Sequence, residues 1–470
     1  MRKTKIVCTL GPATKSTEII EELIRSGMDV ARLNFSHGSL EGHESKIESL
    51  RKISRRLGRN VAILQDLPGP KIRIGSFKKG YATLKPQSWF TLTNRDVAGD
   101  EHQVSVDYPN LPLEVKRGDT ILIGDGALEL EVTETTSTDI RCHVMAGGHI
   151  SSRKGINLPS GTLKSPSLTE NDRQNLIFGI EKGVDFVALS YVRRAEDIKG
   201  VNEIMKSKES KIPIIAKIET RQALDNIDAL LEEVDGIMVA RGDLGVETPL
   251  ERVPLVQKML IRKANAMGKP VITATQMLGS MVDNPRPTRA EVTDIANAIF
   301  DGTDALMLSE ETAVGNYPVE SVRTMANIAT ASEEGFPYKL FERNGHDRKS
   351  STPDAISYGA CLLAREVDAK AIVTPTESGM TARLVSRYRP AHPIIALSPN
   401  EETIKQLSLS WGVVPIKVER FEDTDDMIER AKRIAVEMGF AKRGEKIVLT
   451  AGLPIGIAGN TNIIKIAPID

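Results

Sequence analysis

Apolar segments that end in polar residues recur along the first two-thirds of the chain. Eight segments follow this pattern: KIVCTLGP, MDVARLNFSHG, NVAILQDLPGP, VDFVALSYVR, IPIIAKIET, VDGIMVARGDLG, KPVITATQM and TDALMLSEET. Stretches of helical period, such as STEIIEELIRSG, separate most of them. Apolar strands that alternate with helices predict an α/β fold, here a closed (β/α)8 TIM barrel with its active site at the carboxyl strand ends. An open doubly wound sheet is the alternative, but no Gly-rich dinucleotide-binding sequence follows the first segment.

The spacing of these segments is interrupted once, between Arg73 and Val184. Short alternating strand patterns fill the interval: YATL, SWFTLT, DTILIGDG, LELEVTE and IRCHVMAGG. We predict a small β-barrel domain (71–167) inserted into one strand-to-helix loop of the barrel, which comprises 1–70 and 168–340. An insertion at that loop would lie over the mouth of the barrel and act as a lid.

A third region follows the polar stretch 341–354. Helical patterns alternate there with the apolar strands AIVTPT, PIIALS, VVPIKV, EKIVLTAG and NIIKIAP. The pattern predicts a separate C-terminal α/β domain, 341–470, of ordinary domain size.

Composition excludes several classes of partner. A net charge of −1 argues against binding to nucleic acid or to a membrane surface, and 4% aromatic residues argue against base stacking. The three cysteines lack metal-ligand or disulfide-framework spacing, and the chain opens on a strand pattern rather than an apolar signal region. We therefore expect a cytoplasmic protein.

Two carboxylates follow neighbouring predicted strands, Glu219 after IPIIAKI and Asp243 after VDGIMVARG. Carboxylates at the ends of neighbouring parallel strands can bind one hard divalent cation and leave positions free for substrate oxygens. Lys217 lies two residues before Glu219 and so on the same strand face. A metal and an ammonium that converge on one anionic ligand indicate phosphate or enolate chemistry.

Other strand ends add polar groups suited to the same chemistry. They are Arg32, Asn34, Ser36 and His37 on the second segment, Asp66 on the third with Lys71 and Arg73 beyond it, Gly242 on the sixth, Thr275 on the seventh, and Ser309 and Glu311 on the eighth. Taken singly, Lys217 is equally explained by a structural ion pair, His37 by a structural role, and Thr275 and Ser309 by helix caps. The coincidence of such groups at nearly every strand end favours catalysis.

The motifs that carry these residues resemble those of pyruvate kinases of the bacterial type, over essentially the whole chain. The matching strings are CTLGPAT, ARLNFSHG, GPKIR, KGINLP, AKIE, ARGDLGVE, ATQML, NPRPTRAE and LSEET. The resemblance implies transfer of the phosphoryl group of phosphoenolpyruvate to ADP, followed by protonation of the enolate to pyruvate. It also implies a homotetramer.

The resemblance implies a role for each matching residue. Lys217, Arg73, Thr275, Ser309 and Glu311 would be catalytic, and Arg32, Lys217, Gly242, Asp243 and Thr275 would bind substrate. Asn34, His37, Arg73 and Lys154 would bind the nucleotide, Glu219 and Asp243 would hold Mg²⁺ or Mn²⁺, and Asn34, Ser36, Asp66 and the Leu67 carbonyl would line a monovalent-cation site.

The chain departs from the family pattern at three places. Relatives that require K⁺ carry glutamate at Lys71 and threonine at Leu67, so this chain resembles the K⁺-independent group. We expect the Lys71 ammonium to replace the cation and to pair with Asp66; the alternative is that it points to solvent. Glu310 stands where the family usually has glycine, and its carboxylate either points to solvent or alters the proton relay.

The loop TESGMT (376–381) follows a predicted strand of the C-terminal domain. The hydroxyls of Thr376, Ser378 and Thr381 and the amide of Gly379 suggest a site for a phosphorylated effector, although an ordinary helix cap explains the segment equally well. Related loops often carry basic residues at Glu377 and Met380. A sugar monophosphate or AMP is therefore a more plausible activator than fructose 1,6-bisphosphate.

Two other functions use the same features. A metal-dependent lyase or aldolase would also need the Glu219–Asp243 pair, but it would not need Lys154 on a lid to contact nucleotide phosphates. A protein that only senses a phosphorylated metabolite would not need Lys217 together with that pair. Release of pyruvate that depends on ADP distinguishes these functions from phosphoryl transfer.

Overall fold

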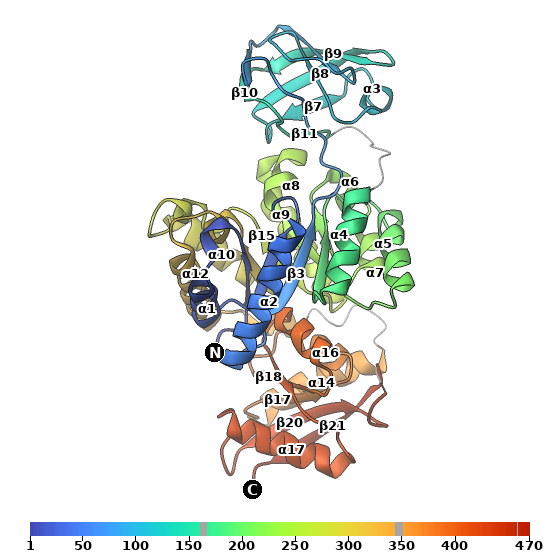
Figure 1. The fold of residues 1–470 in the computed structure, drawn as a ribbon. Coiled ribbons are helices and arrows are strands. Elements are labelled where there is room, and N and C mark those ends of the chain that lie inside the picture. The colour runs from blue at the N-terminus through green and yellow to red at the C-terminus, as the bar shows by residue number, and fades with distance from the viewer. Residues whose placement is uncertain (160–166, 344–350, 458) are drawn as a thin grey trace.

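The computed structural model describes the chain except for residues 160–166, 344–350 and 458. Three units lie in a row: the inserted β domain at one end, the barrel in the middle and the C-terminal domain at the other end (Figure 1). The predicted domain limit at 167 adjoins a segment outside the described residues, and the limit at 341 lies within α13 (Tyr338–Arg343). Part of the predicted polar linker 341–354 lies outside the described residues. None of the helices in the described ranges is long and apolar enough to cross a membrane.

The closed barrel predicted from the sequence is confirmed, and each of the eight predicted segments contains one of its strands. The strands are β1 (Lys5–Thr9), β2 (Val30–Asn34), β3 (Ala62–Leu67), β12 (Phe186–Leu189), β13 (Ile214–Ile218), β14 (Gly236–Ala240), β15 (Val271–Ala274) and β16 (Ala305–Leu308). Every neighbouring pair is parallel, and β1 closes the barrel by pairing with β16 as well as with β2. The alternative prediction of an open doubly wound sheet is therefore wrong.

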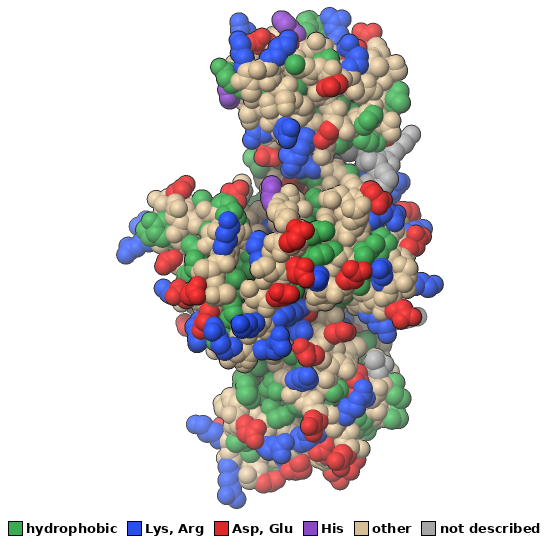
Figure 2. Space-filling view, viewed as in Figure 1, with side chains coloured by type: hydrophobic (Ala, Val, Ile, Leu, Met, Phe, Trp, Pro, Cys, Tyr) green, Lys and Arg blue, Asp and Glu red, His purple; other side chains and the backbone are tan. Residues whose placement is uncertain are grey.

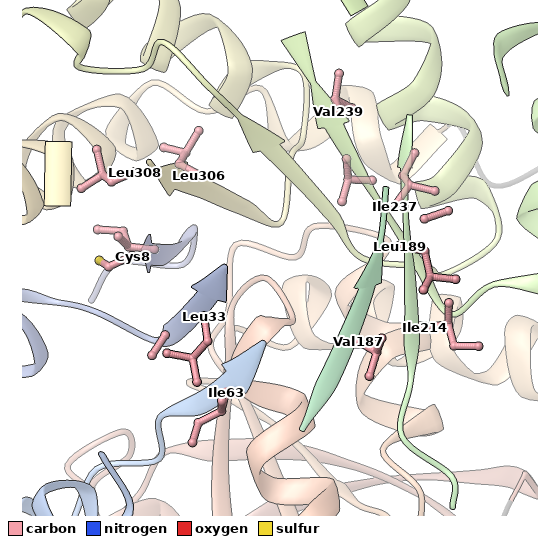
Figure 3. Packing of buried hydrophobic residues seen from close by; sticks show 14 of the residues in the cluster. Cys8, Leu33, Ile63, Val187, Leu189, Ile214, Ile237, Val239, Leu306 and Leu308 are labelled. Atoms are coloured by element: carbon pink, nitrogen blue, oxygen red, sulfur yellow. The ribbon is translucent and has the colours of Figure 1, made fainter. Parts of the chain in front are cut away.

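Helices surround the barrel in the expected alternation with its strands. They include α1 (Thr17–Ser26), α2 (Leu40–Leu57), α4 (Glu170–Glu181), α5 (Glu196–Ser207), α6 (Arg221–Asp225), α7 (Ile227–Glu233), α8 (Arg241–Glu247), α9 (Val253–Ala266), α10 (Arg289–Phe300), α11 (Glu310–Ala313) and α12 (Pro318–Glu334). Side chains of alternate strand residues form the apolar layer between strands and helices; Leu33, Ile63 and Val187 are three of them (Figure 3).

Apolar strand residues that alternate with these helix-facing ones point into the barrel. They form a second apolar cluster, to which each barrel strand contributes. Val7, Val30 and Leu64 are members. Because it draws on all eight strands, this cluster is the floor inside the barrel. Leu409, from a short 3-10 helix (Leu407–Leu409) of the C-terminal domain, packs into the same cluster and is fully buried.

The inserted domain is all β apart from one short helix. A six-stranded sheet runs in the order β11-β7-β8-β9-β5-β6, and β10 pairs with β4 in a two-stranded sheet. Their bounds are β4 (Tyr81–Leu84), β5 (Trp89–Thr93), β6 (Gln103–Ser105), β7 (Thr120–Ile123), β8 (Leu128–Thr135), β9 (Asp139–Ala146), β10 (Gly148–Ser151) and β11 (Ile156–Asn157), with α3 at Leu111–Glu114. The sequence pattern found the four-residue strands β4 and β7 but missed β6, β10, β11 and α3, which have two to four residues and so show little periodicity.

The C-terminal domain is a five-stranded sheet in the order β19-β18-β17-β20-β21, with apolar clusters on both faces. Its elements are α14 (Thr352–Glu366), β17 (Ile372–Pro375), α15 (Met380–Ser386), β18 (Ile394–Ser398), α16 (Glu401–Gln406), β19 (Val413–Lys417), α17 (Thr424–Glu437), β20 (Lys446–Gly452) and β21 (Thr461–Pro468). All five predicted apolar segments are strands, and β21 alone of these pairs antiparallel.

A buried ion pair joins the C-terminal domain to the base of the barrel. The Arg389 Nη2 atom lies 2.8 Å from Asp304 Oδ2, and the two side chains are 1% and 5% exposed. Arg389 also donates to the Asn265 side chain and to the Gly302 carbonyl. Asp304 directly precedes β16, so this junction lies at the amino ends of the strands, opposite the predicted site.

Candidate active site

Three charged side chains form the layer directly above the apolar floor of the barrel. Arg32, Asp66 and Lys217 each follow an inward-facing floor residue of their own strand by two positions, so they too point inward. Arg32 Nε lies 2.6 Å from Asp66 Oδ2, and Lys217 Nζ lies 3.4 Å from Asp66 Oδ1. The strand phase thus brings together three residues predicted from the sequence.

The Lys217 ammonium has three partners in a nearly dry environment. It lies 2.9 Å from Glu219 Oε1 and donates to Ser190 Oγ at 2.7 Å, in addition to Asp66. Burial alone lowers the pKa of Lys217, but the charges of Asp66 and Glu219 outweigh burial and raise it above its usual value. Burial alone raises the pKa of Asp66, yet Lys217 and Arg32 hold that pKa below its usual range. The site therefore contains a lysine fixed as a cation.

Glu219 and Asp243 meet beside Tyr191. Glu219 is 2% exposed, and its Oε2 accepts the Tyr191 backbone N–H at 2.7 Å, while Asp243 Oδ1 accepts the Tyr191 hydroxyl at 3.4 Å. Burial raises the pKa of Glu219; Lys217 opposes this, and the neighbouring charge of Asp243 adds to it. Two neighbouring carboxylates of like charge fit a hard divalent cation between them.

The two carboxylates would supply only part of a coordination shell. Among the residues that the structure describes, no group of three or more His, Cys, Asp and Glu side chains is arranged to hold a metal. A cation bound by Glu219 and Asp243 would therefore take further ligands from substrate, water or the backbone, which suits a catalytic rather than a structural metal.

The predicted pairing of Lys71 with Asp66 is wrong. The ion pairs of Asp66 are with Arg32 and Lys217, whereas Lys71 Nζ lies 3.7 Å from Asp243 Oδ1. The turn Pro68–Gly69–Pro70, with Gly69 at φ 65°, leads the chain away from the strand end before Lys71 is reached. Lys71 is 28% exposed, so it does not simply point to solvent, and it lies beside the divalent rather than the monovalent ligands.

The Lys71 side chain crosses the backbone of the inserted domain at Gly155. A Cβ atom at Gly155 would lie 2.7 Å from the Lys71 Cε atom, so any larger residue there would displace the end of the Lys71 side chain. The connection between the barrel and the inserted domain also carries Arg73 and Lys154, and both are exposed. Arg73 forms a backbone bridge with Gly155. Lys and Arg side chains gather at this edge of the inserted domain, where it faces the barrel (Figure 2).

The remaining predicted cation and nucleotide ligands lie at the carboxyl ends of β2 and β3 and on the loop after β2. Asn34 pairs with Asp66 in the register of the two strands, and the Asn34 Oδ1 atom accepts the Ser36 N–H at 3.1 Å. The Leu67 carbonyl accepts the Ser190 hydroxyl at 2.7 Å. Ser36 and His37 are exposed on the loop that follows β2, on the side of the inserted domain.

Thr275 adopts a left-handed backbone conformation, with φ 67°, immediately after β15. Its hydroxyl accepts the Gly242 N–H at 2.8 Å and donates to the Ala274 carbonyl at 2.7 Å. Arg241 holds the turn by donating to the carbonyls of Ala274 and Thr275 and is itself paired with Asp294 at 2.7 Å. A β-branched residue rarely adopts this conformation, and such strain concentrates at functional sites.

Glu311 fixes the backbone at the ends of β15 and β16. Its carboxylate accepts the N–H groups of Ser309, at 2.7 Å, and of Leu278, at 3.0 Å. The Ser309 hydroxyl is buried and has no hydrogen-bond partner among the described residues. Glu310 is exposed, so of the two alternatives for this departure the structure places its carboxylate toward solvent.

Sequence reasoning missed Ser190, Tyr191, Arg241 and Glu247. Ser190 and Tyr191 are the polar end of the fourth segment, VDFVALSYVR, so the same rule that found the others would have found them. Tyr191 and Glu247 line a small pocket between the barrel and the inserted domain, where Asn157 donates to the Glu247 carboxylate at 3.3 Å. No motif spacing predicts the contact between Asn157 and Glu247, because the two residues belong to different domains.

The loop 376–381 borders a second cavity, of about 200 Å³, in the C-terminal domain. Thr376 and Thr381 line it, together with Glu377 and Arg420. The Thr376 hydroxyl accepts the Gly379 N–H at 3.0 Å, and the Ser378 carbonyl accepts from Arg383. The structure thus brings Thr376 and Thr381 to the cavity and engages Gly379 and Ser378 in contacts with Thr376 and Arg383.

A closed parallel barrel with this cluster of cations and carboxylates at its strand ends defines a barrel enzyme for anionic substrates. Residues 1–322 match the model of the pyruvate kinase barrel domain, and residues 354–467 match that of the pyruvate kinase alpha/beta domain. The chain belongs to the pyruvate kinase family and is a phosphotransferase of that family.

Individual relatives agree over the whole length of the chain. It is 45% identical to a pyruvate kinase of Clostridium acetobutylicum, covering 100% of both sequences. It is 48% identical to a pyruvate kinase of Bacillus licheniformis, covering 99% of this chain and 80% of that one. The solved structure of a pyruvate kinase from Cryptosporidium parvum has a TM-score of 0.95 and 37% identity, covering 100% of this chain and 96% of that one.

The strain at Thr275 predicts an unusual order of stability between two variants. At an ordinary helix or strand position, glycine is about 0.5–1 kcal/mol less stable than alanine. We expect Thr275→Gly to be more stable than Thr275→Ala, because only glycine adopts the left-handed conformation without cost, and both to lose activity with the hydroxyl. Urea unfolding with kcat/KM measurement tests this, with Ala326→Gly in α12 as the control for the ordinary order. A Thr275→Ala variant more stable than Thr275→Gly would contradict the strain.

Proposed function

We propose that the cluster at the carboxyl ends of the barrel strands transfers the phosphoryl group of phosphoenolpyruvate to ADP, giving ATP and pyruvate. The observation that carries the proposal is the buried Lys217 ammonium, held between Glu219 at 2.9 Å and Asp66 at 3.4 Å at the mouth of the barrel. Phosphoryl transfer needs positioning and charge neutralisation more than covalent chemistry. An assay of pyruvate release from phosphoenolpyruvate with Mg²⁺, in the presence and absence of ADP, tests the reaction and separates it from lyase or aldolase chemistry.

Each residue of the cluster has a role in binding the substrate, the metal or the nucleotide that follows from its position. Lys217 and Arg32 offer positive charge to the phosphoryl group, and the Gly242 N–H and Thr275 hydroxyl bind the carboxylate end of the substrate. Glu219 and Asp243 would hold Mg²⁺ or Mn²⁺, which polarises substrate oxygens when bound. Asn34, His37, Arg73 and Lys154 would bind the phosphates of the nucleotide, with the last two brought in by the inserted domain.

The enolate left after transfer needs a proton donor in a site that excludes water. Ser309 has a buried hydroxyl without a partner in the described part of the chain, and Thr275 has a second hydroxyl after the neighbouring strand. Glu311 would act through the backbone that it fixes rather than by direct contact. We propose that these three residues position the proton relay, and that the exposed Glu310 takes no part.

We further propose that the enzyme is a cytoplasmic homotetramer, since this is what the family resemblance implies. Light scattering coupled to size-exclusion chromatography gives the number of subunits directly. A monomeric, fully active enzyme would contradict the tetramer without affecting the proposed reaction.

The first variant that tests the mechanism is Lys217→Met. We expect kcat to fall by about 10²–10³, the scale of a lost electrostatic group in an active site. Mn²⁺ binding should persist, because Glu219 and Asp243 remain. Lys78→Met, which removes an exposed ion pair with Asp100 on the inserted domain, is the matched control and should keep full activity. Turnover of Lys217→Met close to that of the wild type would remove Lys217 from the mechanism.

We propose that the enzyme needs no added K⁺, because the Lys71 ammonium supplies positive charge beside the reacting groups. Its support is the position of Lys71 Nζ, 3.7 Å from the carboxylate of Asp243. The charge would act from the side of the divalent ligands, while Arg32 and Lys217 already neutralise Asp66 in the predicted monovalent site. A second cation placed among these groups would be repelled.

Turnover in a buffer whose only monovalent cation is a bulky quaternary ammonium tests this proposal. We expect added KCl, at about 100 mM and matched ionic strength, to change kcat little in the wild type. Lys71→Glu should become dependent on K⁺, because it replaces the built-in charge with a carboxylate. A gain of about tenfold or more in the wild type, some 1.4 kcal/mol of barrier, would mean that the cation still performs the role assigned to Lys71.

We propose that the cavity beside Thr376 and Thr381 binds a phosphorylated effector with one phosphate, such as ribose 5-phosphate or AMP. Glu377 supports a single phosphate: its carboxylate is held by Asn400 at 3.0 Å and lies 3.9 Å from Arg420, so it offsets a cation that a second phosphate would need.

At subsaturating phosphoenolpyruvate, we expect the monophosphates to activate and fructose 1,6-bisphosphate to have little effect. Thr381→Val should weaken activation without changing the basal rate. Strong activation by the bisphosphate alone would overturn the reading of Glu377.

A further inference from the structure

The loop between β2 and α2 carries His37 and follows Asn34, the two barrel residues proposed for nucleotide binding. Its backbone is tied to the strand ends by three hydrogen bonds. The Phe35 N–H donates to the Asp66 carbonyl at 3.0 Å, the Ser36 N–H donates to Asn34 Oδ1, and the His37 N–H donates to the Asn34 carbonyl at 3.3 Å. These contacts hold the start of the loop, and His37 itself is exposed.

A second histidine holds the far side of the same loop. His43, in the first turn of α2, is 3% exposed, and its ring stacks on Phe35 with ring centroids 4.0 Å apart and planes inclined by 10°. Its Nε2 atom lies 2.9 Å from the His37 carbonyl oxygen. Gly38 lies beside the ring, and its backbone has φ 90°. A Cβ atom at Gly38 would lie 3.4 Å from His43 Nε2. The ring is therefore fixed by stacking and its nitrogen is aimed at the loop.

The hydrogen bond defines the protonation of this ring. A carbonyl oxygen only accepts, so the Nε2 atom of His43 carries the proton. Burial lowers the pKa of His43, against the opposing effect of the His37 hydrogen bond, so the ring is neutral and its Nδ1 atom carries a lone pair. That Nδ1 is buried and has no partner among the described residues.

An unsatisfied buried nitrogen costs free energy, so histidine is not the residue that would best stabilise this position by packing alone. Phenylalanine would stack on Phe35 without that cost. What histidine adds is the hydrogen bond from Nε2 to the His37 carbonyl, on a loop that faces the inserted domain.

We infer that His43 is a positioning residue for the nucleotide site: it fixes the His37 carbonyl and thereby holds the side chains of Asn34 and His37 toward the nucleotide phosphates. The inference rests on the proposed nucleotide role of those two residues. It predicts an effect on ADP and not on phosphoenolpyruvate, because Arg32, Lys217 and the carboxylate pair are fixed by other contacts.

Steady-state kinetics of His43→Phe and His43→Gln test the inference. His43→Phe keeps the stacked ring and loses the donor, so we expect the KM for ADP to rise about fivefold, the scale of one lost hydrogen bond, with the KM for phosphoenolpyruvate unchanged. His43→Gln carries an amide N–H near the position of Nε2 and should restore most of the ADP affinity. His143→Phe, which alters a histidine beside Trp89 on the inserted domain, is the matched control.

Two further variants keep the test decisive. Gly38→Ala strains the backbone of the same loop, because Gly38 has φ 90°, and should raise the KM for ADP even if His43→Phe does not fold. His37→Ala separates the two claims: an unchanged KM for ADP would reject the proposed nucleotide role of His37. A raised KM in His37→Ala, together with an unchanged KM in His43→Phe or an equal rise for both substrates, would overturn the positioning role of His43. A lower melting temperature with unchanged KM values would likewise reduce His43 to a structural residue.

Discussion

Closure of the barrel obliges every second side chain of each strand to point into a shared interior. The first inward layer is apolar in every strand, and it includes Val30, Leu64 and Ile215. Two residues further along the same strands, Arg32, Asp66 and Lys217 have the same inward orientation at the mouth. The site therefore depends on the hydrogen-bond register of the barrel, because a slip by one residue would turn these charges toward the surrounding helices.

The charges assembled in this way are stable only as a group. Lys217 is surrounded by Asp66, Glu219 and the Ser190 hydroxyl, while Arg32 takes the other oxygen of Asp66. Removing one member leaves a buried charge without its partner, which is why such clusters tolerate little variation. The same cluster is preorganised for an anionic substrate, since its cations are already desolvated before the substrate arrives.

The sequence predicted features that follow from periodicity and missed those that depend on where a turn leads. All eight barrel strands were found because each is an apolar run with a polar end, and Arg32, Lys217 and Glu219 followed from strand phase. The partner of Lys71 was predicted wrongly because the turn after Leu67 carries it to Asp243. The contact between Asn157 and Glu247 joins two domains, and no local pattern encodes it.

The order of the chain and the architecture of the barrel do not coincide, and this shapes how the protein matures on the ribosome. The first three strands emerge before the inserted domain, so β3 cannot pair with β12 until that whole domain has been synthesised. Leu409 completes the floor of the barrel only after about the first half of the C-terminal domain has been synthesised. Domains are generally completed from the amino terminus onward during synthesis. Until Leu409 emerges, the nascent barrel lacks one of the side chains that cover its apolar floor in the finished protein.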